Sequence, residues 1–259
     1  MNVLTYLSHS AIPSYPPDVF KYPDFYKCKE HVYVLNPGDI LYIPPYWFHW
    51  VFSYNNENDI NVAFSFMILN EDIISKTSNP DILKNKPFTY HYENDLINYN
   101  NSLETIFKLK EKVEILKSKN VNLYPENKIK TDNIVREEIE LSKISELSKL
   151  SKLNLKNSFN FVAGQESLTH VFKTLPSLRP PEYLLYLLNK NTEELKYKPL
   201  LWISYSKECT KHDKIPINTG LHYDATPNFI FQIKGIKVVR LYSPLCHSKL
   251  YVKPFVIKR

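Results

Sequence analysis

The segment TGLHYDATPNFIFQIKGIKVVRLYSP, residues Thr219–Pro244, decides how the rest of the chain is interpreted. It holds two strand-like apolar runs, NFIFQI and IKVVRLY, on either side of Lys234-Gly235, and this pattern predicts a hairpin with a two-residue turn. His222 and Asp224 stand just before these runs. Alternate side chains of a strand point to one face, so an imidazole and a carboxylate can meet there at one point. Only fifteen residues follow Pro244, too few to close a β-barrel around that point.

Most His-x-Asp triplets in proteins bind nothing, so the pair alone is weak evidence for a metal ion. A metal site at this point needs a second histidine. Two histidines and one carboxylate form the facial triad that suits non-haem Fe(II) and leaves coordination positions open. The candidate is His49, in NPGDILYIPPYWFHWVFS (Asn36–Ser53), where aromatic neighbours would bury it. A buried imidazole must be satisfied, either by a metal ion or by a hydrogen bond to a backbone carbonyl. The sequence leaves both alternatives open.

Together the two segments resemble one family. NPGDILYIPPYWFHWVFS resembles the distal half of the JmjC-type, cupin-like 2-oxoglutarate oxygenases, where a Gly-Asp turn, a strand and an Ile-Pro step precede a tryptophan and an iron-binding histidine. The segment from Thr219 resembles their proximal half, with its His-x-Asp pair, an asparagine and a Gly-x-Lys. The nearest likenesses are the tRNA wybutosine hydroxylase type and the asparaginyl hydroxylase that acts on hypoxia-inducible factor. The resemblance implies a double-stranded β-helix, a jelly roll that is mainly β with helices.

The two halves stand in reversed order in this chain, since the distal half comes first. We therefore expect a circularly permuted barrel, which is possible when the original ends lie close together at the surface. Two alternatives stay open. Two chains could exchange halves and form a homodimer, or the sequence could be a piece of a tandem array or of a misjoined gene.

The resemblance implies His222, Asp224 and His49 as iron ligands. It implies that the co-substrate 2-oxoglutarate is held by four further residues, namely Lys237, Thr219, Asn228 and Tyr183, with Tyr186 as the alternative to the last. A lysine inside an apolar barrel would need an anionic partner, which supports Lys237 independently. A lysine at a hairpin edge remains the alternative for this residue.

One pair of positions departs from the family pattern. Near the end of INVAFSF some relatives have an asparagine and an aromatic residue, where this sequence has Ala63 and Ser65. The departure makes the floor of the expected pocket less polar and leaves the iron ligands unaffected.

The chain divides into three regions by pattern. Residues 1–70 form the distal half, and alternating runs within 22–67 predict a strand meander. Residues 71–158 form a helical, partly low-complexity connecting region, with one helix capped by Ser102 that carries Leu103 to Leu116 and another that begins at Thr131. Residues 159–259 form the proximal half, in which a helix in RPPEYLLYLLNK precedes the strands.

Composition points to an intracellular protein of the cytoplasm or nucleus. Three cysteines without a CxxC pair favour a reducing compartment, and no apolar run is long enough to span a membrane. The net charge is +6, and every ionised side chain after Asp224 is basic. Such a region can attract RNA, although a lysine-rich edge strand has the same composition.

We therefore expect an Fe(II)- and 2-oxoglutarate-dependent hydroxylase of a macromolecule, either a modified tRNA base or a protein side chain. The competing hypothesis is a non-catalytic cupin-like module for binding or dimerisation. The substrate assignment depends on family likeness, because one fold hosts many functions.

Overall fold

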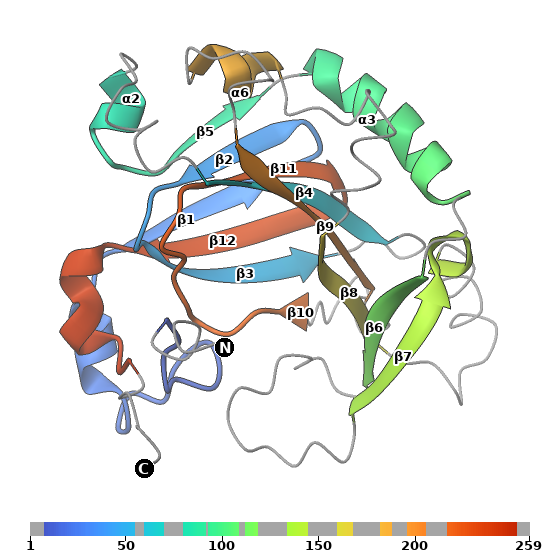
Figure 1. Ribbon diagram of the computed structural model, residues 1–259. Coiled ribbons are helices and arrows are strands. Elements are labelled where there is room, and N and C mark those ends of the chain that lie inside the picture. The colour runs from blue at the N-terminus through green and yellow to red at the C-terminus, as the bar shows by residue number, and fades with distance from the viewer. Residues whose placement is uncertain are drawn as a thin grey trace.

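Two antiparallel β-sheets form the body of the protein (Figure 1). The computed structural model describes residues 8–54, 60–69, 80–91, 93–108, 112–118, 134–144, 160–167, 182–187, 196–205 and 217–252. The strands are β1 Glu30–Leu35, β2 Asp39–Ile43, β3 Phe48–Tyr54, β4 Asn61–Ile68, β5 Phe88–His91, β6 Lys112–Ser118, β7 Ile134–Glu140, β8 Asn160–Ser167, β9 Tyr197–Tyr205, β10 Ile217–Asn218, β11 Asn228–Lys234 and β12 Ile236–Tyr242. The helices are α2 Pro80–Leu83, α3 Glu93–Ile106 and α6 Glu182–Leu187, with 3-10 helices η2 Pro23–Lys27 and η5 Pro244–Lys249.

Strands from the front and the rear of the chain alternate in both sheets. The smaller sheet has the order β1-β12-β3-β10, and the larger has the order β5-β2-β11-β4-β9-β8-β6-β7. Each of the rear strands β11 and β12 therefore lies between two front strands and makes hydrogen bonds to both. This arrangement confirms the expected mainly β, jelly-roll fold, and both halves of the chain contribute strands to each sheet.

Buried side chains fill three layers. Between the sheets lie residues such as Leu41, Ile230 and Val239. The outer face of the larger sheet is covered by α3, whose Tyr99 packs on Phe231 with ring centroids 4.8 Å apart. The outer face of the smaller sheet is covered by the first described residues and by η2 and η5. Because β4 and β11 are covered on both faces, their sequences read as continuous apolar runs.

The predicted meander and hairpin are both wrong. Consecutive strands β1 to β4 belong to alternate sheets, because a rear strand separates each pair of front strands that share a sheet. Strands β11 and β12 do not pair with each other, and Lys234-Gly235 is a corner at which the chain passes from one sheet to the other. Gly235 has a φ of +74°, and a Cβ there would lie 2.7 Å from Nδ2 of Asn61, so only glycine fits this corner.

The helices predicted within 71–158 are also partly wrong. Ser102 lies inside α3, which ends at Ile106, and Val113 and Leu116 belong to β6. The residues from Ile134 onward form β7, whereas Thr131 and the stretch beyond residue 144 lie outside the described residues. β6 pairs with β8, and β7 pairs with β6, so both extend the larger sheet. Pairing with the edge of that sheet outweighed the helical spacing of their apolar residues.

The helix predicted in RPPEYLLYLLNK is present as α6. Among the described residues, no helix has the length and apolar composition needed to cross a bilayer.

Candidate metal centre and co-substrate pocket

His222 is held between two other segments by backbone hydrogen bonds. On one side, its N–H and carbonyl bond to the carbonyl and N–H of His49 in β3, at 3.2 and 2.7 Å. On the other side, the N–H of Tyr223 donates to the carbonyl of Ser8 at 3.0 Å, and the N–H of Ser10 donates to the carbonyl of Leu221 at 2.8 Å. The His-x-Asp segment is thus a short bridge between front segments and not part of a long strand.

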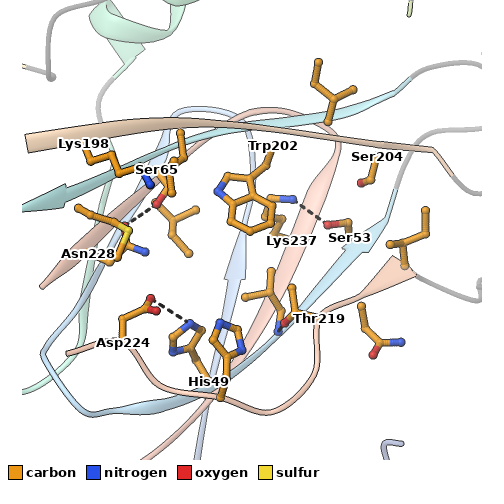
Figure 2. Close-up of a pocket in the computed structure, with 18 residues that line it drawn as sticks. His49, Ser53, Ser65, Lys198, Trp202, Ser204, Thr219, Asp224, Asn228 and Lys237 are labelled. Carbon is orange, nitrogen blue, oxygen red and sulfur yellow. Dashed lines mark hydrogen bonds and ion pairs between the residues drawn. The ribbon is translucent and has the colours of Figure 1, made fainter. Parts of the chain in front are cut away.

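The side chains of His49, His222 and Asp224 converge at one point (Figure 2). One nitrogen of each imidazole and one carboxylate oxygen lie within 4.8 Å of one another. Nε2 of His49 lies 3.6 Å from Oδ2 of Asp224. Among the described residues, no other three His, Cys, Asp or Glu side chains meet in this way.

Backbone carbonyls orient both imidazoles. Nδ1 of His49 lies 3.0 Å from the carbonyl of Trp47, and Nδ1 of His222 lies 2.7 Å from the carbonyl of Gly220. A carbonyl only accepts, so each Nδ1 carries the proton and each Nε2 keeps its lone pair for a metal ion. For His49 the sequence allowed either a metal ion or a hydrogen bond to a backbone carbonyl. The structure has the hydrogen bond at Nδ1, and Nε2 remains available to a metal ion.

Burial keeps His49 neutral. Loss of hydration lowers the pKa of His49, the neighbouring His222 lowers it further, and Asp224 offsets only part of this. Neutral imidazole is the form that binds metals. His9 lies against His222 with ring centroids 5.3 Å apart, so a third histidine, which the sequence did not reveal, packs beside the centre.

A cavity of about 260 Å³ extends from these three residues between the two sheets. Lys237, Thr219 and Asn228, the co-substrate residues implied by the resemblance, all line it. The side chain of Tyr183 lies outside the described residues, so that prediction stays untested. Its alternative Tyr186 is 77% exposed and does not line the cavity.

Lys237 is a buried cation without a carboxylate partner among the described residues. Its side chain is only 4% exposed, and Nζ donates to Oγ of Ser53 at 2.7 Å and to Oδ1 of Asn61 at 2.8 Å. Both partners are neutral, and burial lowers the pKa of Lys237 to about 7. The predicted lysine in the barrel is confirmed, whereas its alternative position at a hairpin edge is wrong.

In the described part of the chain, the hydroxyl proton of Thr219 and the amide NH₂ of Asn228 have no hydrogen-bond partner. Oγ1 of Thr219 accepts from the N–H of Val51 at 3.1 Å, which leaves its hydroxyl proton available. Oδ1 of Asn228 accepts from Oγ of Ser65 at 2.5 Å, so the departure at Ser65 introduces a partner that fixes the Asn228 amide.

The sequence did not reveal two groups that support Lys237. Ser53 lies four residues after His49 in β3, on the same face of the strand. Alternation along the strand could therefore have predicted that Ser53 lines the cavity. Asn61 is fixed by its own bonds to the carbonyls of Tyr54 and Ile236. No local pattern indicates Asn61, because its partners come from both halves of the chain.

Comparisons with known proteins agree with this architecture. Residues 4–67 match the sequence profile described as a cupin-like domain. A protein of Acanthamoeba polyphaga mimivirus named for a JmjC domain, L887, is 26% identical over 249 residues, which is 92% of this chain and 38% of that protein. HSPB1-associated protein 1 of Rattus norvegicus and of Bos taurus is in each case 40% identical over 37 residues, 14% of this chain and 8% of theirs. No solved structure matches.

These matches support a cupin-like, JmjC-type domain. The chain spans only 38% of the length of the mimivirus relative, so the activity of a whole protein does not follow from the likeness.

Two variants test whether one chain supplies all three converging groups. We expect His49→Ala and His222→Ala chains, unfolded together and refolded as a mixture, to bind no more Co(II) than each variant refolded alone. The reason is that each chain closes on itself and keeps its own defect. Absorption of bound Co(II) measures the result, and wild-type protein refolded in the same way is the control. Restored binding in the mixture would show that chains exchange halves.

Proposed function

We propose that the protein is an Fe(II)- and 2-oxoglutarate-dependent oxygenase that hydroxylates a macromolecule. The observation that supports this most strongly is the content of one cavity. Two imidazoles and a carboxylate lie at one end, and a buried lysine that has no anionic partner in the described part of the chain lies at the other. A ligand that chelates a metal at one end and carries a carboxylate at the other satisfies both ends.

His49, His222 and Asp224 fit iron because they offer two nitrogens and one oxygen. The chemistry that iron supplies when bound is the use of O₂ to oxidise 2-oxoglutarate to succinate and CO₂ while a C–H bond of the substrate becomes C–OH. The carbonyls of Trp47 and Gly220 hold the imidazole tautomers that leave Nε2 free.

The other end of the cavity binds the far carboxylate of 2-oxoglutarate. Lys237 provides the positive charge, and the hydroxyl of Thr219 provides a directed donor. Ser53 and Asn61 keep the ammonium group in place before the ligand arrives. Apolar side chains such as Val51 and Ile230 line the space between the two ends and exclude water from it.

We further propose that the barrel is circularly permuted. The support is that β11 and β12, from the rear of the chain, are each inserted between front strands in the order of a jelly roll. Exchange of halves between two chains would satisfy the same pairings, and the mixed refolding experiment separates the two arrangements.

Turnover of 2-oxoglutarate tests the proposal directly. We expect anaerobically purified protein, given Fe(II) and then O₂, to release succinate, and we expect His222→Ala to reduce the rate by more than about 100-fold. Loss of residues around metal ligands already costs ~10–100-fold, and His222 is itself a proposed ligand. The control is His91→Ala, whose imidazole pairs with Asp39 at 2.7 Å outside the cavity.

A non-catalytic cupin-like module predicts a different result. It would release no succinate, and neither Fe(II) nor 2-oxoglutarate would raise its melting temperature, because stabilisation by a ligand requires binding to the folded state. Silence in both measurements would overturn the proposed function.

The pKa of Lys237 predicts how 2-oxoglutarate binding depends on pH. At pH 8 the free lysine is mostly neutral, since its pKa is lowered to about 7, and the bound carboxylate favours the charged form. Binding should therefore take up close to one proton at pH 8 and almost none at pH 6, where Lys237 is already charged. Titration calorimetry in buffers of different ionisation enthalpy measures this uptake.

Lys237→Arg is the matched variant, because its guanidinium stays charged at both pH values. The variant should bind 2-oxoglutarate without proton uptake at pH 8. Proton uptake by the arginine variant equal to that of wild type would contradict the role of Lys237.

The lowered pKa of Lys237 also determines how the stability of the ligand-free protein depends on pH. The unfolded chain holds one proton more than the folded chain between about pH 7 and pH 10.5, so the free energy of unfolding should rise with pH in that window.

For the macromolecule we propose tRNA, with a protein side chain as the other class. The support is the basic region after Asp224, although two of its cations have other contacts. Lys237 is buried in the cavity, and Arg240 pairs with Glu30 at 2.6 Å. Contacts with phosphate would therefore fall to the remaining basic residues, among which Lys249 is described.

Salt dependence tests the tRNA proposal. We expect tRNA affinity to fall linearly with salt on logarithmic axes, because each phosphate contact releases counterions. Lys249→Ala should make the slope less steep by about one contact. Filter binding over a range of salt concentrations measures the slope, and Lys84→Ala, in the turn after α2, is the control. Absence of tRNA binding at physiological salt would favour a protein substrate.

A further inference from the structure

Strand β9 forms one wall of the cavity. Its alternate residues Lys198, Leu200, Trp202 and Ser204 line the cavity, as expected for one face of a strand, and Ile203 also contributes. Figure 2 shows the indole of Trp202 extending from β9 into the space between the two sheets. None of the expected co-substrate residues lies on this strand.

The strand register places Trp202 between the two ends of the cavity. One row across the larger sheet holds Asn228, Met67 and Lys198, on the side where Figure 2 draws Asp224. Another row pairs Asn61, which bonds Lys237, with Ser204.

Trp202 belongs to the row next to that of Asn61, together with Ala63 and Gln232. Residues two apart on a strand lie about 7 Å apart. The indole is therefore one row from the lysine end of the cavity, on the path from there toward the metal end.

The neighbours of Trp202 on β4 are small. Ala63 is its cross-strand partner, and Ser65 pairs with Leu200, one row further along the strands. The indole of Trp202 therefore supplies most of the bulk on this part of the cavity wall.

The indole N–H is available to a ligand. Trp202 is half-buried, and among the described residues its Nε1 has no hydrogen-bond partner. Tryptophan combines an apolar ring with one donor, and this donor usually finds a partner when the ring is buried. A bound carboxylate or keto oxygen is such a partner.

From this geometry we infer that Trp202 determines the length of the 2-oxo acid that the cavity accepts. The ring packs along the carbon chain of the acid and closes the space beside Lys237, so the five-carbon diacid fits and the six-carbon diacid does not. This inference rests on the proposed function, because it takes 2-oxoglutarate as the ligand.

A panel of acids tests this role without turnover. The affinities of 2-oxoglutarate and 2-oxoadipate are measured by titration calorimetry, with Mn(II) in place of iron and without O₂. Wild type should prefer 2-oxoglutarate by tenfold or more, since one methylene group in a fitted pocket is worth ~10-fold to 200-fold. Trp202→Ala should lower that preference by about tenfold, through weaker 2-oxoglutarate binding and a gain for 2-oxoadipate. Trp202→Phe should retain most of the preference.

Tryptophan fluorescence gives a second measurement. Binding of 2-oxoglutarate should change the emission of wild type and of Trp47→Phe, the control. The indole of Trp47 does not line the cavity and bonds the carbonyl of Asn85, and the substitution keeps the backbone carbonyl that orients His49. The change should be largely lost in Trp202→Phe. This variant also keeps the test decisive if Trp202→Ala does not fold, which thermal melting followed by circular dichroism would reveal.

The outcomes separate this inference from the proposed function. If wild type binds neither acid, the proposed function fails and the inference fails with it. If wild type binds 2-oxoglutarate while the Trp202 variants keep the same preference and the same fluorescence change, only the inference is overturned.

Discussion

The backbone pairing of His49 with His222 is the constraint on which the site depends. Two hydrogen bonds, at 2.7 and 3.2 Å, join residues that are far apart in the sequence, and no local preference of either segment could bring them together. The pairing is possible only because β12 lies beside β3 and because residues 8–10 bond the other side of the same bridge. The three converging side chains are therefore a product of the whole barrel, since each sheet contains strands of both halves.

A second constraint acts at the opposite end of the cavity. Lys237 is held by two neutral groups, so its burial costs free energy whether the amine is charged or neutral. In the function that we propose, this cost would provide selectivity, because a ligand without a carboxylate would leave the lysine without an anionic partner. The corner at Gly235 belongs to the same arrangement, since the absence of a side chain there lets Asn61 approach the backbone and reach Lys237.

The sequence predicted those features whose signal is local. His49, His222 and Asp224 lie in short segments that resemble the JmjC-type family. The same resemblance implied Lys237, and the position of a cation in an apolar run supported it. The partners of each strand were not predictable in the same way. Alternation in EHVYVL or NFIFQI specifies which side chains share a face, but it does not specify which strand lies beside it, and for this reason the meander and hairpin were wrong. Val113 and Leu116 fit a helical spacing, yet they lie in β6, where an available sheet edge outweighed the helical pattern. Trp202 belongs to no recognisable sequence motif, and only the strand register shows that it lies between the two ends of the cavity.

The most direct test of the central claim is a crystal structure of the protein grown with Fe(II) under anaerobic conditions, with anomalous scattering recorded at the iron absorption edge. We expect one strong peak bonded to Nε2 of His49, Nε2 of His222 and the carboxylate of Asp224 of the same chain, at about 2 Å from each ligand atom. A peak elsewhere, no peak at all, or a His49 contributed by another molecule would contradict the proposal that one chain builds the whole centre.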